Sequence, residues 1–496
     1  MNEIIIDVGL YENRVAIIEE NELVEIFHER KEDKKIQGNV YKGRVVNVLP
    51  GMQAAFINIG LEKNAFLYVR DAVPKSMLNQ NIDIKSLSIK DLVKQGQELI
   101  VQVIKEPYGT KGARVTTHIT LPGRYLVLMP YNTYVGVSRK ISSEEERERL
   151  KKVAESIRPE DMGLILRTAS KDKTEEDLKQ DIDYLVNIYS KIDRERNLGT
   201  SPRVIYKDFD LLGRTIRDMF TKKIDKILIN DKNKYEDLLE LSSNISPNLK
   251  SRIHYFERGD DLFKVTGIDS KIKSALDKKV WLKSGGYIII DETEALTSID
   301  VNTGKFVGSI NLKDTVYKTN IEAAKEITKQ LRLRNIGGII IIDFIDMTNK
   351  EDEENLINVF KNELKKDRTK TTVLGITQLG LLEMTRKKSR NKLSTRLLSE
   401  CPCCNGTSKI KSTDFLLTKI EKEAERVSIH TSAEGILFEL NPFKLKEIIE
   451  DYKDMIEIIE NHFNIKIYMV GNEDLKIDDL INKKMGRIID IEKIMD

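Results

Sequence analysis

The sequence predicts a multidomain α+β protein. The chain has 496 residues, which at roughly 150 residues per domain suggests about three domains. Hydrophobic residues make up 40% and charged residues 33% of the chain, so it can build several cores and is not a disordered protein. Short β-rich runs dominate the first 120 residues, whereas strands alternate with segments of helical apolar spacing after that.

The first part of the chain is predicted as strands. Short apolar runs occur at 4–6, 14–18 and 23–27, with polar turns between them. Five further candidate strands follow, at 42–49, 54–59, 64–69, 99–105 and 113–119, and Pro50-Gly51 is a turn signal between the first two. Five short strands in about 80 residues predict an OB-type barrel.

Aromatic residues in this barrel suggest a nucleic-acid surface. Tyr41, Phe56 and Phe66 could stand on one sheet face as base-stacking platforms, with Lys42 and Arg44 beside them. The alternative is that these aromatic side chains fill the barrel core. Spacing alone favours the core for at least one of the two phenylalanines.

The rest of the chain mixes helices and strands. We expect strands at 125–129, 163–167, 226–229, 435–440 and 465–470, and helices at 142–158, 173–197, 318–335, 413–427 and 443–460. Residues 281–380 are the most apolar β-type stretch, and residues 412–496 form a last α/β unit.

Carboxylates follow the apolar strands of residues 281–380. One strand ends at Asp291, and its expected hairpin partner carries Asp300 and Asn302, which share a face because side chains repeat every two residues. A later strand, too apolar for a sheet edge, ends at Asp343.

Mg²⁺ prefers oxygen ligands, and it can activate water and neutralise charge on a phosphate. Asn302 could orient the Asp300 carboxylate. The alternative is that each aspartate caps a turn or a helix.

All three cysteines lie in one short segment, at 401, 403 and 404. Cys401 and Cys404 have C-x-x-C spacing, which supplies two of the four ligands of a structural Zn²⁺ site. A second copy of the chain could supply the other two, which predicts a two-fold dimer with zinc at the interface. A pair of reduced buried cysteines is the alternative, and Cys403 could replace Cys404 as ligand or stay free.

The net charge of +2 hides an uneven distribution. Residues 412–496 hold 12 basic and 19 acidic residues, so residues 1–411 carry a balance of +9. Residues 361–411 alone hold 13 basic and 4 acidic residues, which suits a polyanion-binding surface. For the basic run at 386–390, a solvated helix face is the alternative.

Composition also suggests the compartment. The longest unbroken apolar run, at 339–342, is far short of a membrane span, and the acidic start of the chain is no signal peptide. Three clustered cysteines exclude a disulfide framework. We therefore expect a cytoplasmic protein with no membrane partner.

Several ungapped motifs resemble the ribonuclease E/G family along nearly the whole chain, and the resemblance is weakest after about residue 412. The matching stretches are residues 38–44, 49–56, 109–114, 284–291, 299–304, 330–334 and 337–347.

The resemblance implies a domain plan. A split RNase H-like domain would combine residues 1–35 and 207–278. An S1-type OB-fold RNA-binding domain at 36–119 and a 5′-end sensor region at 120–206 would be inserted in it. A DNase I-like catalytic domain at 279–398, a zinc link at 399–411 and a small α/β dimerisation domain at 412–496 would follow.

The resemblance also implies roles for single residues. Asp300 and Asp343 would hold the catalytic Mg²⁺, Asn302 would orient Asp300, and Cys401 and Cys404 would bind the shared Zn²⁺. The remaining positions fall on Phe56, Phe66, Lys42 and Lys111 for RNA binding, and on Gly123, Val127, Arg167 and Thr168 for sensing a 5′-monophosphate. One branch of the family has a tyrosine at Ile59, so one RNA contact would be missing here, and the thiol of Cys403 is a second departure.

The activity implied is a Mg²⁺-dependent endoribonuclease that cuts single-stranded, AU-rich RNA to leave 5′-phosphate and 3′-hydroxyl ends and favours 5′-monophosphorylated substrates. Its expected roles are ribosomal RNA processing, including maturation of the 5′ end of 16S RNA, and messenger RNA decay. The chain would act as a homodimer or a dimer of dimers, without an extension that scaffolds a degradosome. A non-catalytic RNA-binding or ribosome-associated factor and a metal phosphatase are the competing readings.

Overall fold

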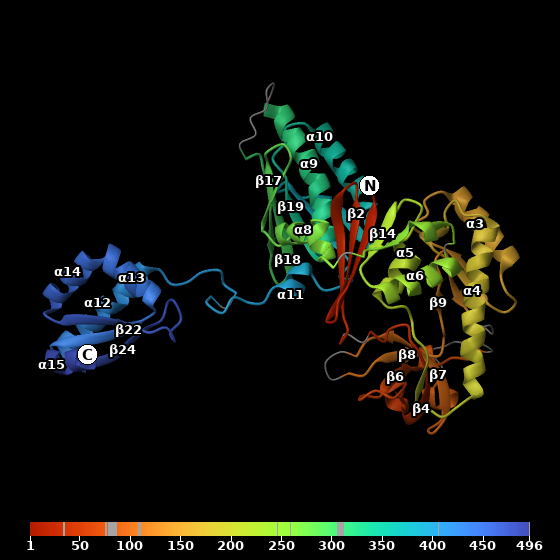
Figure 1. The fold of residues 1–496 in the computed structure, drawn as a ribbon, viewed down its shortest axis with the longest axis horizontal. Coiled ribbons are helices and arrows are strands. Elements are labelled where there is room, and N and C mark those ends of the chain that lie inside the picture. Colours follow the sequence, from red (N-terminus) through yellow and green to blue (C-terminus); the bar gives the residue numbers. More distant parts are fainter. Residues whose placement is uncertain are drawn as a thin grey trace. The chain divides into compact units, whose positions relative to one another are not determined.

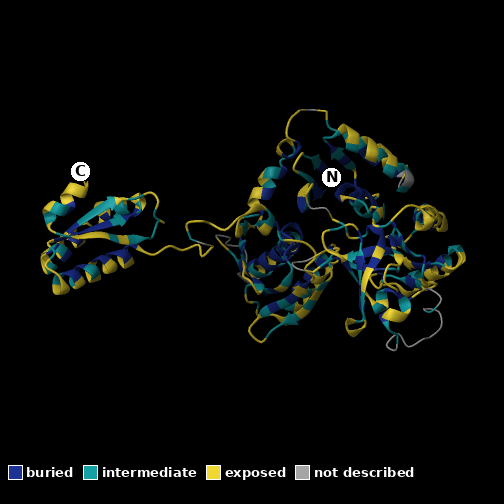
Figure 2. Cartoon of the chain, turned by 90° about the horizontal axis from the view of Figure 1, so that it is seen from below, coloured by how far each residue is buried: buried dark blue, intermediate teal, exposed yellow. Residues whose placement is uncertain are grey.

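The computed structural model describes residues 1–32, 35–74, 77, 87–107, 111–245, 247–257, 259–304, 312–404 and 406–495. The chain forms two compact units, Met1–Leu393 and Ser394–Asp496. Figure 1 shows each unit as helices packed on sheets, and Figure 2 shows buried residues where helices and sheets of the same unit pack together. Of the resembling stretch at 109–114, residues 109 and 110 lie outside the described residues.

The N-terminal strands belong to a sheet that two distant segments share. Its strands are β1 (Glu3–Val8), β2 (Glu12–Glu19), β3 (Glu22–Arg30), β14 (Lys226–Ile229) and β15 (Ile253–Tyr255), in the order β15-β14-β1-β2-β3. β1 pairs in parallel with β14 and antiparallel with β2. Ile4, Ile5 and Ile6 of β1 are all fully buried because helices cover both faces of the sheet: α5 (Leu211–Met219) and α6 (Lys232–Ile245) on one, α7 (Leu262–Val265) and α8 (Ile268–Ser274) on the other.

A closed five-stranded barrel of OB type follows β3. It consists of β4 (Val40–Leu49), β5 (Ala54–Asn58), β6 (Ala65–Tyr68), β8 (Arg114–Thr116) and β7 (Glu98–Lys105), and pairing of β4 with β7 closes it. The prediction of five barrel strands is confirmed. A sixth strand, β13 (Arg203–Tyr206), pairs with β4, and the short helix α2 (Ile89–Leu92) packs on the barrel.

The region after the barrel is a small sheet packed on two long helices. The sheet has the order β11-β12-β10-β9 and comprises β9 (Leu121–Pro122), β10 (Leu126–Met129), β11 (Val135–Val137) and β12 (Gly163–Leu166). The helices are α3 (Glu144–Ile157) and α4 (Glu175–Arg194), and both are close to the predicted ranges. Ser143 and Thr174 cap their N-termini, and Thr174 forms a capping box with Asp177.

A six-stranded sheet carries the predicted carboxylates. Its order is β16-β17-β18-β19-β21-β20, with β16 (Lys279–Trp281), β17 (Tyr287–Glu292), β18 (Leu296–Asn302), β19 (Gly338–Asp343), β20 (Thr371–Ile376) and β21 (Leu381–Arg386). β17 and β18 form the predicted hairpin, and β19 is a central strand as its apolar sequence indicated. α9 (Leu312–Leu333) and α10 (Lys350–Leu364) lie on one side of this sheet in Figure 1 and bury its apolar side chains. The other face of the sheet carries Asp300 and Asp343.

The basic run at 386–390 is not a uniform charged surface. Arg386 is only 3% exposed, and its guanidinium binds Asp367 and the carbonyl of Ile336. The Arg390 guanidinium lies 3.9 Å from the ring centre of Phe27. Two of the four cations in this run therefore stabilise the fold, while Lys387 and Lys388 are exposed.

The second unit holds the cysteines and a three-stranded α/β domain, and the short helix α11 (Leu393–Leu397) begins at the last residue of the first unit. The sheet has the order β23-β22-β24, with β22 (Gly435–Leu440), β23 (Lys466–Gly471) and β24 (Leu480–Gly486). Four helices accompany it: α12 (Thr413–His430), α13 (Pro442–Asp451), α14 (Lys453–Phe463) and α15 (Ile488–Met495). The single helix expected at 443–460 is wrong, because the chain breaks at Tyr452, whose φ of −129° is not helical. β24 and α15 were not predicted.

Among the described residues, we find no helix with the length and apolar content that crossing a membrane would require.

Candidate active site and nucleic-acid interface

Asp300 and Asp343 lie side by side on neighbouring strands. β18 and β19 run parallel, and Asp300 is the register partner of Asp343. Asn302 lies two residues further along β18 and donates a hydrogen bond from Nδ2 to Oδ2 of Asp300 at 2.7 Å. Asp300 lies within β18, so it does not cap a turn or a helix, whereas Asp343 is the last residue of β19. The structure thus brings together the three residues that the sequence pattern singled out.

Glycines allow this arrangement at the end of the hairpin. A Cβ atom on Gly286 would lie 2.8 Å from the carbonyl oxygen of Asn302. Gly304 has a φ of +61°, and a Cβ atom there would lie 2.5 Å from the carbonyl oxygen of Gly285. A side chain at either position would therefore push the end of β18, and Asn302 with it, out of place.

The electrostatics of the pair favour a cation. Burial, and then the negative charges of Asp300 and Asp346, raise the pKa of Asp343. Both register partners are exposed on the open face of the sheet, so solvent and a divalent ion can reach their oxygens. Two neighbouring carboxylates supply oxygen ligands of the kind that Mg²⁺ takes, and water and a substrate phosphate commonly fill its other positions. No group of three or more His, Cys, Asp or Glu side chains suited to a metal occurs in the described part of the chain.

A helix residue holds the loop after β19, and no sequence pattern pointed to it. Asn320, fully buried in α9, donates from Nδ2 to the carbonyl of Ile345 at 2.7 Å and accepts the Ile345 N–H at 3.1 Å. These two hydrogen bonds fix the backbone next to Asp346, whose negative charge helps to raise the pKa of Asp343. The sequence signal that could have identified Asn320 is an asparagine on the apolar side of a predicted helix, because a buried amide needs hydrogen-bond partners.

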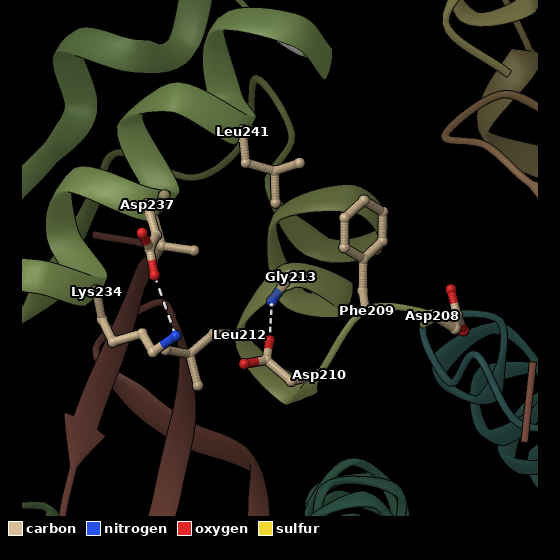
Figure 3. A pocket seen from close by; sticks show the side chains of 9 residues that line it. Asp208, Phe209, Asp210, Leu212, Gly213, Lys234, Asp237 and Leu241 are labelled. Atoms are coloured by element: carbon tan, nitrogen blue, oxygen red, sulfur yellow. Dashed lines mark hydrogen bonds and ion pairs between the residues drawn. The ribbon is translucent and has the colours of Figure 1, made fainter. Parts of the chain in front are cut away.

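A separate pocket lies in the first sheet region (Figure 3). It has a volume of about 370 Å³ between α5 and α6. Its acidic groups already have partners: Asp210 accepts the Gly213 N–H at the start of α5, and Asp237 pairs with Lys234 at 3.0 Å. The pocket therefore has a structural explanation and is not the candidate site.

The barrel presents aromatic side chains outside its core. Phe56 and Phe66 are register partners, with ring centres 5.7 Å apart, and both are half-buried. Tyr68, two residues after Phe66, extends the cluster at 4.5 Å, and the Arg114 guanidinium lies 5.0 Å from the Tyr68 ring. The expectation that one phenylalanine fills the core is wrong; Tyr41, by contrast, is a core residue. Tyr68 was missed, although the two-residue period of a strand places it on the same face as Phe66.

The two lysines expected to bind RNA differ in exposure. Lys111 is exposed. Lys42 is only 5% exposed, and its ammonium donates to the carbonyls of Leu198 and Gly199 and lies 3.0 Å from a Glu98 oxygen. Because its side chain is almost fully buried, unlike that of Arg167, which is 32% exposed, we assign Lys42 a structural role and leave it out of the proposed RNA surface.

Arg167 and Thr168 follow β12. Arg167 donates to Asp218 at 2.7 Å and to the carbonyl of Gly123 at 2.5 Å. Burial would raise the pKa of Asp218, but the hydrogen bond and charge of Arg217, together with Arg167, hold that pKa below its usual value. The Thr168 hydroxyl is 3.0 Å from the hydroxyl of Ser138, a residue that the sequence did not single out.

Hydrogen bonds to one buried carboxylate hold the backbone after Gly123. The buried carboxylate of Asp181 accepts the N–H groups of Arg124, Tyr125 and Leu126. A Cβ atom on Gly123 would lie 2.5 Å from Asp181 Oδ2, so only glycine fits. Val127 lies within β10 and pairs with Ile165. The N–H groups of Arg124, Tyr125 and Leu126 already donate to Asp181, so a ligand in this region would meet side chains rather than these N–H groups.

The cysteine segment forms a turn around Cys401. The N–H groups of Cys404 and Cys403 point at the Cys401 sulfur and lower its pKa, while the nearby Cys401 charge raises the pKa of Cys403. Cys404 accepts the Ser408 N–H at 3.3 Å. The alternative of a buried pair is wrong, because Cys401 and Cys403 are exposed and Cys404 is half-exposed. Soft thiolates held in such a turn are chemically suited to Zn²⁺.

Comparison with known proteins gives a consistent result. The model of the ribonuclease E/G family matches residues 120–389. Ribonuclease G of Escherichia coli strain K12 is 45% identical over 428 residues, which is 86% of this chain and 88% of that protein. Ribonuclease G of Haemophilus influenzae is 44% identical over 452 residues, 90% of this chain and 92% of that protein. Ribonuclease E of Nostoc sp. is 38% identical over 405 residues, 79% of this chain and 58% of that protein.

Proposed function

The chain belongs to the ribonuclease E/G family, and from this membership and the geometry of Asp300 and Asp343 we propose that it is a Mg²⁺-dependent endoribonuclease. It would hydrolyse single-stranded RNA. A water oxygen attacks the phosphorus, the bond to the 3′ oxygen breaks, and the 3′ oxygen leaves with a proton, which yields 5′-phosphate and 3′-hydroxyl ends. The register pairing of Asp300 with Asp343 is the observation that carries this proposal.

Each residue of the candidate site has its own role. Asp300 and Asp343 would hold Mg²⁺, which when bound supplies an activated water and neutralises charge on the phosphate. Asn302 fixes the orientation of the Asp300 carboxylate through its 2.7 Å hydrogen bond. Asn320 fixes the loop next to Asp346.

Two further surfaces support a single-stranded substrate. Phe56, Phe66 and Tyr68 offer stacking faces for bases, and the guanidinium of Arg114, which also pairs with Asp71, lies 5.0 Å from the Tyr68 ring. Lys111 is a further exposed cation of the same region of the chain. Arg167 and Thr168, with Ser138, would bind a 5′-monophosphate and so favour monophosphorylated substrates. The preference for AU-rich RNA, the processing of ribosomal RNA and the decay of messenger RNA are proposed from the family resemblance.

We also propose that the chain works as a zinc-linked dimer in the cytoplasm. Cys401 and Cys404 would supply two of four Zn²⁺ ligands, and a second chain the other two.

The test is cleavage of a 5′-monophosphorylated, AU-rich single-stranded RNA with and without Mg²⁺. We expect internal cuts by the intact protein with Mg²⁺ only. Asp300→Asn and Asp343→Asn should each lose roughly 10²- to 10³-fold in activity, the range for removing electrostatic stabilisation of a transition state. Asn302→Ala should cost about 10- to 100-fold. Ser298→Ala, an exposed position on the same strand, is the control and should retain full activity.

Binding of the RNA without cutting, by the intact protein in Mg²⁺, would instead support a non-catalytic RNA-binding factor. Cuts that survive both aspartate changes would place the active site elsewhere.

A further inference from the structure

An exposed aromatic cluster stands at the edge of the sheet that carries Asp300. Trp281, on edge strand β16, is the single tryptophan of the chain and is 63% exposed. Its ring meets that of Tyr287 edge to face, with centres 5.4 Å apart. The ammonium of Lys279 lies 4.0 Å from the Trp281 ring centre and 3.7 Å from that of Tyr287. Packing of the protein core does not explain such an exposed tryptophan.

The strand register places this cluster beside the carboxylates. Trp281 is the partner of Tyr287, and Tyr287 is the partner of Asn302. In the next row, Lys279 faces Ile289, and Ile289 faces Asp300. Paired residues project from the same side of a sheet, and two strand spacings amount to about 10 Å. The aromatic cluster therefore lies on the same face as Asp300, within roughly two strand spacings of it.

The opposite face confirms this orientation. The residues that alternate with the cluster, Val280, Ile288 and Val301, pack into the core formed with α9 and α10. Trp281, Tyr287, Asn302 and Asp300 consequently share the face that these two helices leave uncovered.

The chemistry of the cluster fits a nucleic-acid base next to a phosphate. Every base offers a π-face that can stack on an aromatic ring, and a neighbouring cation can contact the phosphate that follows. The carboxylates at the centre of the face repel a phosphate chain, so a cation at the flank helps to hold the strand. Lys279 is exposed and supplies this charge.

We propose that Trp281, Tyr287 and Lys279 form a base-stacking site for the nucleotide adjacent to the scissile phosphate. The occupant is the single-stranded RNA substrate, so the proposal rests on the proposed function. The site would add a contact close to the chemistry, separate from the barrel aromatics and from the Arg167 region, and would position the strand across Asp300 and Asp343.

The single tryptophan allows a direct test that needs no cleavage. A short single-stranded RNA is titrated into the intact protein in Mg²⁺-free buffer, and tryptophan fluorescence is followed. We expect saturable quenching, because the base stacks on the only tryptophan ring. Binding is measured in parallel with a labelled copy of the RNA.

Variants then separate a substrate contact from a structural role. Trp281→Ala should raise KM, and the Kd without Mg²⁺, about 5- to 150-fold, the range for losing one base–aromatic stack, with little change in kcat. Trp281→Phe keeps a stacking ring and should restore most of the affinity. Leu374→Ala is the matched control, since Leu374 is 67% exposed on β20 at the opposite edge of the same sheet.

Three outcomes would overturn the proposal. One is labelled RNA that binds without any change in tryptophan fluorescence. A second is a Trp281→Ala protein with lower thermal stability but unchanged KM and Kd. A third is fluorescence that changes on dilution of the protein alone, which would mean that a second copy covers this face. RNA that quenches Trp281 but is never cut would refute the nuclease and leave the stacking site standing.

Discussion

Residue type alone does not decide whether a charged side chain binds a ligand. Lys42 is a cation on a predicted RNA-binding barrel, yet its ammonium is held by Glu98 and two carbonyls. Asn302 and Asp300, on the other hand, could be read from the sequence, because a two-residue spacing in a strand dictates a shared face. The alternation of side chains along a strand can be read from the sequence. The ion pair of Lys42 with Glu98 cannot, because its partner lies 56 residues away.

Glu98 should give the barrel a pH-dependent stability. Hydrogen bonds from Ser201, Lys42 and Arg44 lower its pKa from 4.5 to about 2. A carboxyl with a depressed pKa in the folded state stabilises fully above its unfolded pKa, and this stabilisation is lost as pH falls through the folded value. We therefore expect Glu98→Gln to lower Tm at neutral pH, and the difference from the intact protein to shrink as pH falls from 4.5 towards 2. Thermal melts over this pH range measure the difference in Tm.

The exposed Glu62 in the same part of the chain provides the control Glu62→Gln. A difference in Tm between Glu98→Gln and the intact protein that stays constant with pH would contradict the depressed pKa of Glu98.

Arg167 should set the preference for the 5′ end. Its guanidinium, which donates to Asp218, is the cation proposed to meet a terminal phosphate, together with the hydroxyl of the next residue, Thr168. A charge-assisted hydrogen bond is worth roughly 1.5–3 kcal/mol, so Arg167→Ala should reduce kcat/KM on 5′-monophosphorylated RNA about tenfold or more. Cleavage of 5′-hydroxyl RNA should stay unchanged. Lys152→Ala removes one exposed positive charge from α3 of the same region and should leave the ratio intact. Equal losses on both substrates would show that Arg167 acts only through the fold.

Strands and helices with a clear period were predictable, and interruptions without a sequence signal were not. The five barrel strands, the β17–β18 hairpin and the central β19 follow from alternation and apolar runs. The break between α13 and α14 at Tyr452 has no Gly or Pro to announce it. β24 is a polar strand with exposed lysines, so it lacks the apolar signal of β22. Tertiary pairing, not local preference, makes it a strand.

Arg386 on β21 should be essential for stability, unlike its neighbour Lys387. Its bond to Asp367 ties β21 to the turn after α10, and both side chains are almost fully buried, at 2% and 4% exposure. Removing one partner of a buried pair costs roughly 3–5 kcal/mol, because the other charge is left uncompensated. We expect a loss of about this size in Arg386→Met and at most about 0.5 kcal/mol in the exposed Lys387→Met. Urea unfolding measures both. The double change Arg386→Met with Asp367→Leu should recover part of the loss, and no recovery would mean that the bonds to Ile336 and Asn335 dominate.

At the scale of the whole molecule, chain order and spatial order differ. β1 pairs with β14, although the residues of the barrel and of the β9–β12 sheet lie between these two strands in the sequence. Motif resemblance suggested such a split, but no local pattern in residues 3–30 or 226–255 does, because pairing between distant strands leaves no period in the sequence. Charge follows a similar division: the balance of −7 lies in residues 412–496, and the first 411 residues, which hold all the proposed RNA contacts, carry +9.

Two chains should share one zinc ion, and the chemistry of the three thiols predicts which change breaks the dimer. Cys401 and Cys404 have the C-x-x-C spacing of a zinc-ligand pair, and the N–H groups of Cys404 and Cys403 lower the pKa of Cys401, which favours its thiolate. We therefore expect native mass spectrometry to show two chains with about one Zn²⁺, because four thiolates complete a tetrahedral site. Cys401→Ser should lose the zinc and shift the protein towards monomer, and Cys403→Ser should keep both. A zinc-free dimer that Cys401→Ser leaves unchanged would refute the shared site, and an equal effect of Cys403→Ser would make Cys403 a ligand in place of Cys404.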